Sequence, residues 1–116
     1  MKSLWRGKQQ ENRALSYLRE QGLTLQESNY RSRHGEIDLI MKDGATLVFV
    51  EVRYRSNPRY GGAAASVDRK KIRKIIKTGL SYLQHKKLDT ACRFDVIAIN
   101  GNGDINWIKR AFEMEY

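Results

Sequence analysis

Two apolar segments in the first half of the chain each carry a carboxylate. Asp38 lies within residues 36–41, and Glu51 lies within residues 47–54. Residues 42–46 separate them and contain Asp-Gly, which is a strong hairpin signal between strand-like runs. Two carboxylates held together on a half-buried sheet repel each other, so a proton, a cation or a metal ion must relieve the repulsion.

The hairpin turn decides whether these carboxylates share a face, because strand side chains alternate between faces. If Asp43-Gly44 forms a two-residue turn, the pair is diagonal, with Cβ atoms about 7 to 8 Å apart. If Gly44-Ala45 forms it, the pair is directly opposite, with Cβ atoms about 5 Å apart. Either turn brings Asp38 and Glu51 together, whereas a three-residue loop would place them on different faces.

Magnesium suits such a pair of oxygen ligands. Mg²⁺ keeps several waters and often binds through one or two carboxylates together with the phosphates of a substrate. Mn²⁺ accepts the same kind of ligand. A metal ion at Asp38 and Glu51 can activate water and stabilise negative charge while a phosphodiester is cleaved. We therefore expect Mg²⁺, or Mn²⁺ in its place.

A third carboxylate, Glu11, belongs to a helix predicted over residues 8–21. It shares one face of that helix with Ala14, Leu15 and Leu18. A carboxylate on an apolar stripe is unfavourable without a partner, so a helix packed on the sheet could deliver Glu11 to the metal, directly or through water. Alternatively, Glu11 lies at the stripe's edge near the helix start, where the helix dipole favours anions.

The net charge of +9 is concentrated in one segment. Residues 53–87 hold 11 Lys and Arg and one acid, Asp68, so the rest of the chain carries −1. Such a patch attracts polyanions, nucleic acid above all, although a merely solvated face is the alternative. The residues expected to contact nucleic acid are Arg55, Arg59, Tyr60, Lys70, Lys71, Arg73, Lys74 and Lys77.

The remaining pattern predicts a single α/β domain over residues 1–116. Further strands are expected at 23–30, 93–99 and 105–109, and a second helix follows Ser66, which can cap it. The element order therefore predicts a central mixed sheet of four to five strands flanked by helices. The apolar stripe of the second helix is expected to comprise Ile72, Ile75, Ile76, Gly79, Leu80 and Leu83.

Other features restrict the class of protein. Cys92 is the single cysteine, which excludes an internal disulfide. Asp95, inside an apolar strand, is expected to be structural and to pair with a basic group such as Arg93. No signal-peptide pattern and no run of 18 apolar residues occurs, so we expect a cytoplasmic protein without a membrane partner.

Four sequence blocks resemble the YraN family, also called UPF0102. They are Gly7-x-x-x-Glu11, Gly-Glu-Ile-Asp-Leu-Ile at 35–40, Phe-Val-Glu-Val-Arg-Tyr-Arg at 49–55, and Arg-Phe-Asp-Val at 93–96. The resemblance covers nearly the whole chain, and the order and spacing of the blocks are specific. The resemblance implies a PD-(D/E)XK nuclease superfamily member with a restriction-endonuclease-like core, similar to archaeal Holliday junction resolvases.

The resemblance also implies roles for individual residues. Asp38 matches the motif aspartate, Glu51 the acid of the E-x-K element, and Glu11 the helical acid, all three around a divalent cation. Arg53 stands where the superfamily has a lysine that is thought to orient or activate the attacking water. Arginine stays protonated and cannot be a base, but it can hold a phosphate or stabilise developing charge.

The sequence thus predicts an endonuclease-like phosphodiester hydrolase that acts on DNA, including branched or recombination intermediates. Its catalytic residues would be Glu11, Asp38, Glu51 and Arg53, and a homodimer would suit a symmetric junction. One alternative is a non-catalytic nucleic-acid-binding module on the same scaffold, which Arg53 supports. Another is an adaptor whose basic helix binds an acidic protein.

Overall fold

The computed structural model describes residues 2–55 and 67–113, and side chains from residue 7 onward within them. Its elements are α1 (Lys2–Glu20), β1 (Thr24–Ser32), β2 (Gly35–Asp43), β3 (Thr46–Arg55), α2 (Arg69–His85), β4 (Cys92–Asn100) and β5 (Ile105–Phe112). This order of helices and strands confirms the predicted one. The first helix and the strands are longer than the sequence pattern indicated. No helix within the described ranges is long and apolar enough to cross a membrane.

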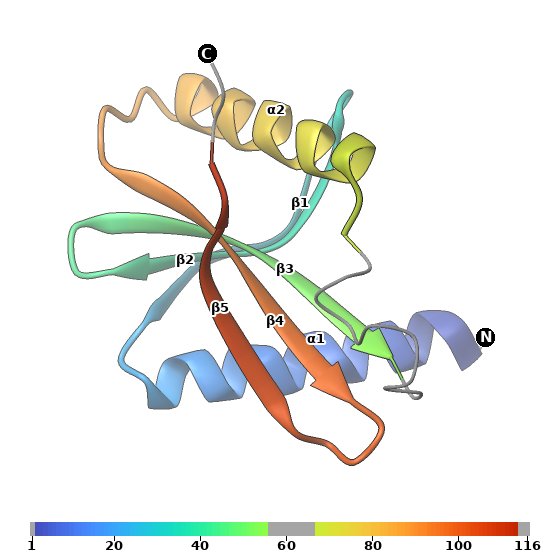
Figure 1. Cartoon of the computed structure of the whole chain (residues 1–116). Helices are drawn as coiled ribbons and strands as arrows, with labels where there is room; N and C mark the ends of the chain where they lie inside the picture. Colours follow the sequence, from blue (N-terminus) through green and yellow to red (C-terminus); the bar gives the residue numbers. More distant parts are fainter. Residues whose placement is uncertain (1, 56–66, 114–116) are drawn as a thin grey trace.

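The five strands form one sheet in the order β1-β2-β3-β4-β5. Neighbouring strands are antiparallel except β3 and β4, which are parallel and are connected through α2. Helices α1 and α2 cover opposite faces of this sheet (Figure 1). The predicted α/β architecture with a central mixed sheet is therefore confirmed.

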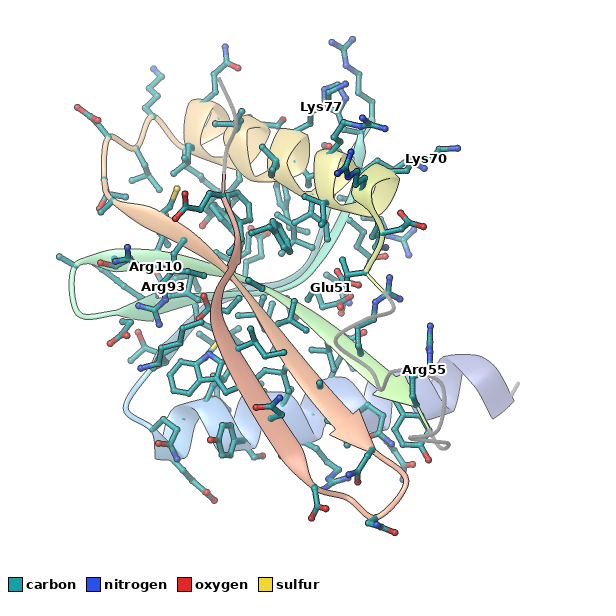
Figure 2. The ribbon with its side chains drawn as sticks, viewed as in Figure 1. Glu51, Arg55, Lys70, Lys77, Arg93 and Arg110 are labelled. Atoms are coloured by element: carbon teal, nitrogen blue, oxygen red, sulfur yellow. The ribbon has the colours of Figure 1, made fainter. Side chains whose placement is uncertain are left out.

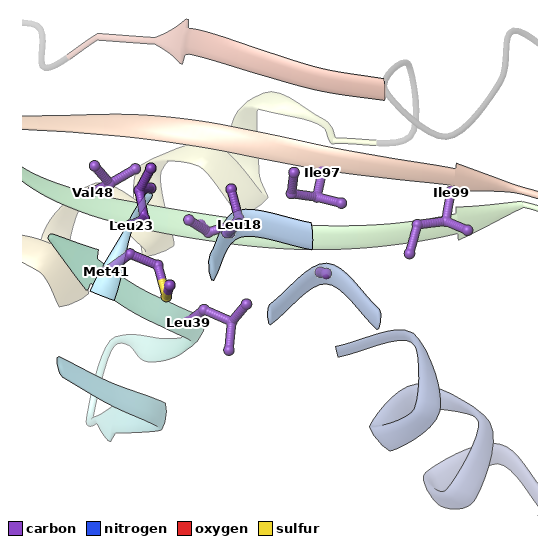
Figure 3. Close-up of a cluster of buried hydrophobic side chains, with 9 residues drawn as sticks. Leu18, Leu23, Leu39, Met41, Val48, Ile97 and Ile99 are labelled. Carbon is purple, nitrogen blue, oxygen red and sulfur yellow. The ribbon is translucent and has the colours of Figure 1, made fainter. Parts of the chain in front are cut away.

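Each face of the sheet has its own hydrophobic core. Ala14 and Leu18 of α1 pack with strand residues that include Leu39, Val50 and Ile97 (Figure 3). On the other face, Ile75 and Tyr82 of α2 pack with a second set, which comprises Ile37, Ile40, Leu47, Phe49 and Phe94. Because both faces of β2 and β3 are covered, a polar side chain on these strands is buried unless it lies near a strand end.

The α2 helix differs from the prediction in its start and in its buried face. Its N-cap is Asp68 instead of Ser66, which lies outside the described residues, and the Asp68 carboxylate accepts a hydrogen bond from the Lys71 N–H at 2.8 Å. The buried stripe is Ile75, Thr78, Gly79 and Tyr82, whereas Leu80 is 45% exposed. Thr78 can be buried because its hydroxyl donates to the Lys74 carbonyl at 2.8 Å.

Gly79 allows α2 to approach two stacked rings. A Cβ at this position would lie 3.0 Å from Phe94 Cε1 and 3.2 Å from Phe49 Cε2. Phe49 is 0% exposed, Phe94 is 2% exposed and the ring centroids are 5.2 Å apart, so neither ring can move freely. We expect Gly79→Ala to lower the free energy of unfolding by about 1 to 3 kcal/mol, because overpacking outweighs the better helix propensity of alanine.

Gly7 provides a matched control for this prediction. It also lies in a helix, it is exposed, and nothing lies within 4 Å of the position that a Cβ would occupy. Gly7→Ala should therefore raise the free energy of unfolding by roughly 0.5 to 1 kcal/mol. Urea denaturation compares the two variants, and equal effects in them would contradict the packing explanation.

Candidate functional site

The β2–β3 hairpin brings Asp38 and Glu51 together at the end of its ladder, where burial and then the charge of Glu51 raise the pKa of Asp38. Asp43 pairs with Thr46, so the turn is Gly44-Ala45, the second of the two predicted turns. The ladder ends at the pair Leu39 and Val50, directly before the two carboxylates in this register. The observed register therefore supports one of the two predicted turns, whereas a shared face for the two carboxylates stays a prediction.

Strands β2 and β3 separate at Asp38. Ile40 and Ile37 both pack toward α2, whereas Leu39 packs toward α1, so the regular alternation of side chains is interrupted between residues 37 and 39. At this interruption, Asp38 Oδ2 accepts a hydrogen bond from the backbone N–H of Val52 at 2.8 Å. The Asp38 carboxylate thus accepts from a backbone N–H of β3 at the point where the β2–β3 ladder ends.

The surroundings of Asp38 disfavour its charged form. The pKa of Asp38 is raised to about 8, chiefly by burial, then by the negative charge of Glu51 and to a smaller extent by that of Glu11. The hydrogen bond from Val52 and the charge of Lys71 lower the pKa, but these effects are outweighed. Without an additional cation, Asp38 therefore holds a proton at neutral pH.

Glu51 is a buried carboxylate with few partners. Its residue is 4% exposed, and Oε2 has no hydrogen-bond partner among the described residues. Its other oxygen, Oε1, lies 3.7 Å from Arg53 Nε and 3.8 Å from Lys71 Nζ. Burial raises the pKa of Glu51, and these two cations lower it. A buried carboxylate oxygen without a donor from the protein can accept one from a water or bind a cation.

Glu11 approaches the pair from α1 but is engaged elsewhere. Asn29 of β1 donates through Nδ2 to Glu11 Oε1 at 2.8 Å and to Glu36 Oε1 at 3.2 Å. Within the residues that the structure describes, no three His, Cys, Asp or Glu side chains are grouped so that they could hold a metal ion. Glu11 is therefore not brought to Asp38 and Glu51 as a third direct ligand of a metal ion. Of the two predicted arrangements, only contact with the ion through a water remains.

Asn29 and Glu36 were not recognised from the sequence as part of this site, and the direction of Lys71 was not foreseen. Asn29 has a φ of 51°, a left-handed conformation that Asn tolerates better than most residues. An asparagine inside a strand pattern was the one available signal. Glu36 was recognised as sharing a strand with Asp38, but its link to Glu11 depends on Asn29. Lys71 was predicted to contact nucleic acid, which stays a prediction, and its ammonium lies 3.8 Å from Glu51 Oε1.

The other predicted nucleic-acid contacts divide into two groups. Arg55, at the end of β3, is exposed, and Lys70 and Lys77 extend from α2 away from the sheet (Figure 2). Arg73 and Lys74 on the same helix are exposed as well. Arg59 and Tyr60 lie outside the described residues. The basic surface is thus presented by the helix that also sends Lys71 to the carboxylates.

Asp95 shows what a structural aspartate looks like in the same sheet. It is 0% exposed, yet its oxygens accept from Arg93 Nε at 3.1 and 3.2 Å, from Trp107 Nε1 at 3.0 Å and from the Arg110 N–H at 3.0 Å. The predicted pairing with Arg93 is confirmed. In contrast to the Asp38–Glu51 pair, Asp95 has its donors within the protein, which supports a functional role for the pair.

The fold and the site define an α/β protein with a poorly compensated carboxylate pair at a fork in a mixed sheet, next to a basic helix. The chain belongs to UPF0102: the family model described as "Uncharacterised protein family UPF0102" matches residues 10–99. A UPF0102 protein of Herminiimonas arsenicoxydans is 52% identical over 107 residues, which cover 92% of this chain and 86% of the relative.

Two further relatives have the same extent of similarity. A UPF0102 protein of Nitrosomonas eutropha is 51% identical over 108 residues, covering 93% of each chain. One of Psychromonas ingrahamii is 53% identical over 104 residues, covering 89% of this chain and 85% of the relative. The resemblance noted from the four sequence blocks is thus confirmed for the family.

Proposed function

We propose that this chain is a metal-dependent endonuclease-like protein of the PD-(D/E)XK type that acts on DNA, including branched intermediates, in the cytoplasm. The observation that carries the proposal is the buried carboxylate of Glu51, whose Oε2 has no hydrogen-bond partner among the described residues and whose charge acts on nearby Asp38. Such a pair supports binding of a hard divalent cation, because carboxylate oxygens are its preferred ligands.

The residues present fit Mg²⁺ or Mn²⁺ at this position. Asp38 and Glu51 would hold the ion, and Glu11 would act through water, since Mg²⁺ usually keeps several waters and needs only one or two carboxylates. A bound ion supplies water activation and offsets charge that develops on the phosphorus oxygens. Its positive charge would also offset the burial and repulsion that keep Asp38 protonated.

The remaining residues position the substrate. Arg53 Nε, a buried donor without a hydrogen-bond partner among the described residues, can bind a phosphate oxygen. Arg55 and the exposed cations of α2, together with Arg59 and Tyr60, would contact the backbone and sugars of the nucleic acid. A homodimer would place two such sites on the two strands of a symmetric junction.

One observation favours a second candidate function, a nucleic-acid-binding module without turnover. Arg53 stays protonated and cannot act as a base, and Asn29 occupies the carboxylate of Glu11. Such a module would keep the basic surface and bind DNA with the salt dependence of phosphate contacts.

Cleavage assays with the full chain distinguish these functions. Duplex, single-stranded and four-way-junction DNA are incubated with Mg²⁺, Mn²⁺ or EDTA. We expect metal-dependent cleavage that falls at least about 100-fold in Glu51→Gln. The variant removes a charged ligand of the proposed metal ion, which offsets the negative charge of the transition state. Glu20→Gln, an exposed carboxylate at the end of α1, is the matched control and should cleave normally.

Two results would contradict the proposal. Cleavage by Glu51→Gln at the parental rate would remove the site from the mechanism. Salt-sensitive binding of DNA without cleavage under any of the metal conditions would favour the module.

A further inference from the structure

We infer that Lys71 and a divalent cation compete for Glu51, and that the displaced lysine then binds a phosphate of the nucleic acid. The inference rests on the proposed function and deepens it, because it assigns to one residue the coupling between metal binding and nucleic-acid binding. Throughout, Lys71 keeps its positive charge and only the position of its side chain changes.

The position of Lys71 is set by the start of α2. Its backbone N–H donates to the capping carboxylate of Asp68 at 2.8 Å, so the main chain is fixed at the third helical residue. From there the side chain reaches β3, where Nζ lies 3.8 Å from Glu51 Oε1. This separation exceeds a hydrogen bond, so the pair is held by charge, and a second cation at Glu51 can take the place of the ammonium.

Lys71 also lies at the boundary between the buried pair and the basic surface. Its side chain is 38% exposed, whereas that of Glu51 is 4% exposed. All the other Lys and Arg residues of α2 are exposed: Arg69, Lys70, Arg73, Lys74 and Lys77. Lys71 is therefore the one cation of this helix that can face either the carboxylates or a ligand on the surface.

Charge decides which of the two it faces. Glu51 is influenced by Glu11 and Glu36 as well as by Asp38, and only Lys71 and Arg53 compensate it at close range among the described residues. A divalent cation at Glu51 provides twice the charge of the ammonium and repels it. The flexible lysine then turns to the surface, where a phosphodiester is the anion that the neighbouring cations attract.

The competition predicts a gain of metal affinity when the lysine is removed. Calorimetric titration with Mn²⁺ should show about tenfold tighter binding to Lys71→Met than to the wild-type chain, because the competing cation is gone. Lys71→Arg keeps the charge and should bind Mn²⁺ like the wild type. Lys42→Met, at an exposed position of β2 outside the basic surface, is the matched control and should leave Mn²⁺ affinity unchanged.

A second readout tests the role of the released lysine. Binding of a labelled duplex is measured with Mn²⁺ and with EDTA, before cleavage becomes detectable. In the wild type and in Lys42→Met, Mn²⁺ should strengthen binding of the duplex, and in Lys71→Met this gain should be lost. Thermal unfolding confirms that each variant is folded, and the Mn²⁺-induced rise in Tm should be larger for Lys71→Met.

Each outcome decides between the inference and the proposed function. Equal or weaker Mn²⁺ binding by Lys71→Met, with wild-type binding intact, overturns the competition and leaves the metal site standing. Failure of the wild type and of Lys71→Met to bind Mn²⁺ overturns both.

Discussion

Asp38→Asn is expected to stabilise the metal-free protein at neutral pH by about 2 to 4 kcal/mol. The pKa of Asp38 is raised from 3.8 to about 8, chiefly by burial and then by the charge of Glu51. Folding at pH 7 must therefore bind a proton or accept an unfavourable buried charge, and one pKa unit corresponds to about 1.4 kcal/mol. Asparagine needs no proton, and its side-chain oxygen can still accept from Val52.

The pH dependence has a definite sign. Because the folded state holds the proton of Asp38 more tightly than the unfolded state, wild-type stability is complete below about pH 4 and declines as the pH rises toward about 8. The difference between Asp38→Asn and wild type should accordingly be small at the acidic end of this window and grow across it. Urea denaturation at several pH values in EDTA measures it.

An exposed aspartate serves as the control for this prediction. Asp89 is exposed, and Asp89→Asn should leave the pH profile unchanged. Parallel profiles for the wild type and Asp38→Asn would show that the carboxylate is not destabilised by its surroundings. Addition of Mg²⁺ should reduce the wild-type loss of stability at high pH, since the proposed ion supplies the missing positive charge.

The proximity of Asp38 and Glu51 could be predicted, because the two-residue loop of the hairpin brings both residues to the end of the same ladder. Two turns fitted the sequence, and choosing Gly44-Ala45 required the structure, because both turns use the conformational freedom of Gly44 (φ 61°). The fork at Asp38 could not be predicted. A prediction of side-chain faces with a period of two assumes that the β2–β3 ladder continues through Asp38. The alternation is interrupted there, because Ile37 packs toward α2.

The face of α2 shows a similar limit. Counting apolar residues placed Leu80 inside and ignored Thr78, yet the opposite holds. A threonine that satisfies its hydroxyl within its own helix is as easily buried as an apolar residue, and Gly79 brings that side of the helix closest to the sheet. The side of α2 that faces the sheet therefore includes Thr78 and excludes Leu80, and Lys71 in the first turn lies near Glu51.

Two aspartates of the sheet each accept a backbone N–H where the strand register shifts or ends. Asp38 accepts from Val52 at the end of the β2–β3 ladder, and Asp95 accepts from Arg110 at the register shift between β4 and β5. They differ in compensation, because Asp95 also has the Arg93 guanidinium and the Trp107 indole. Removing each carboxylate should therefore change stability in opposite directions.

Asp95→Ala is expected to lower the free energy of unfolding by about 3 to 5 kcal/mol. The change leaves the Arg93 guanidinium, whose side chain is 13% exposed, without its buried partner, and it strands the Trp107 and Arg110 donors. Asp43, the other partner of Arg93 at 3.0 Å, is 39% exposed, so Asp43→Asn should cost no more than about 1 kcal/mol.

A double variant separates the buried charge from the packing of the aspartate. In Arg93→Met/Asp95→Ala, no unpaired guanidinium remains, so the double variant should be more stable than Asp95→Ala alone, as measured by urea denaturation. Loss of stability in Asp95→Ala no greater than in Asp43→Asn would contradict the argument. If both results hold, Asp95 is compensated by the protein itself, in contrast to Asp38, whose surroundings favour the protonated form.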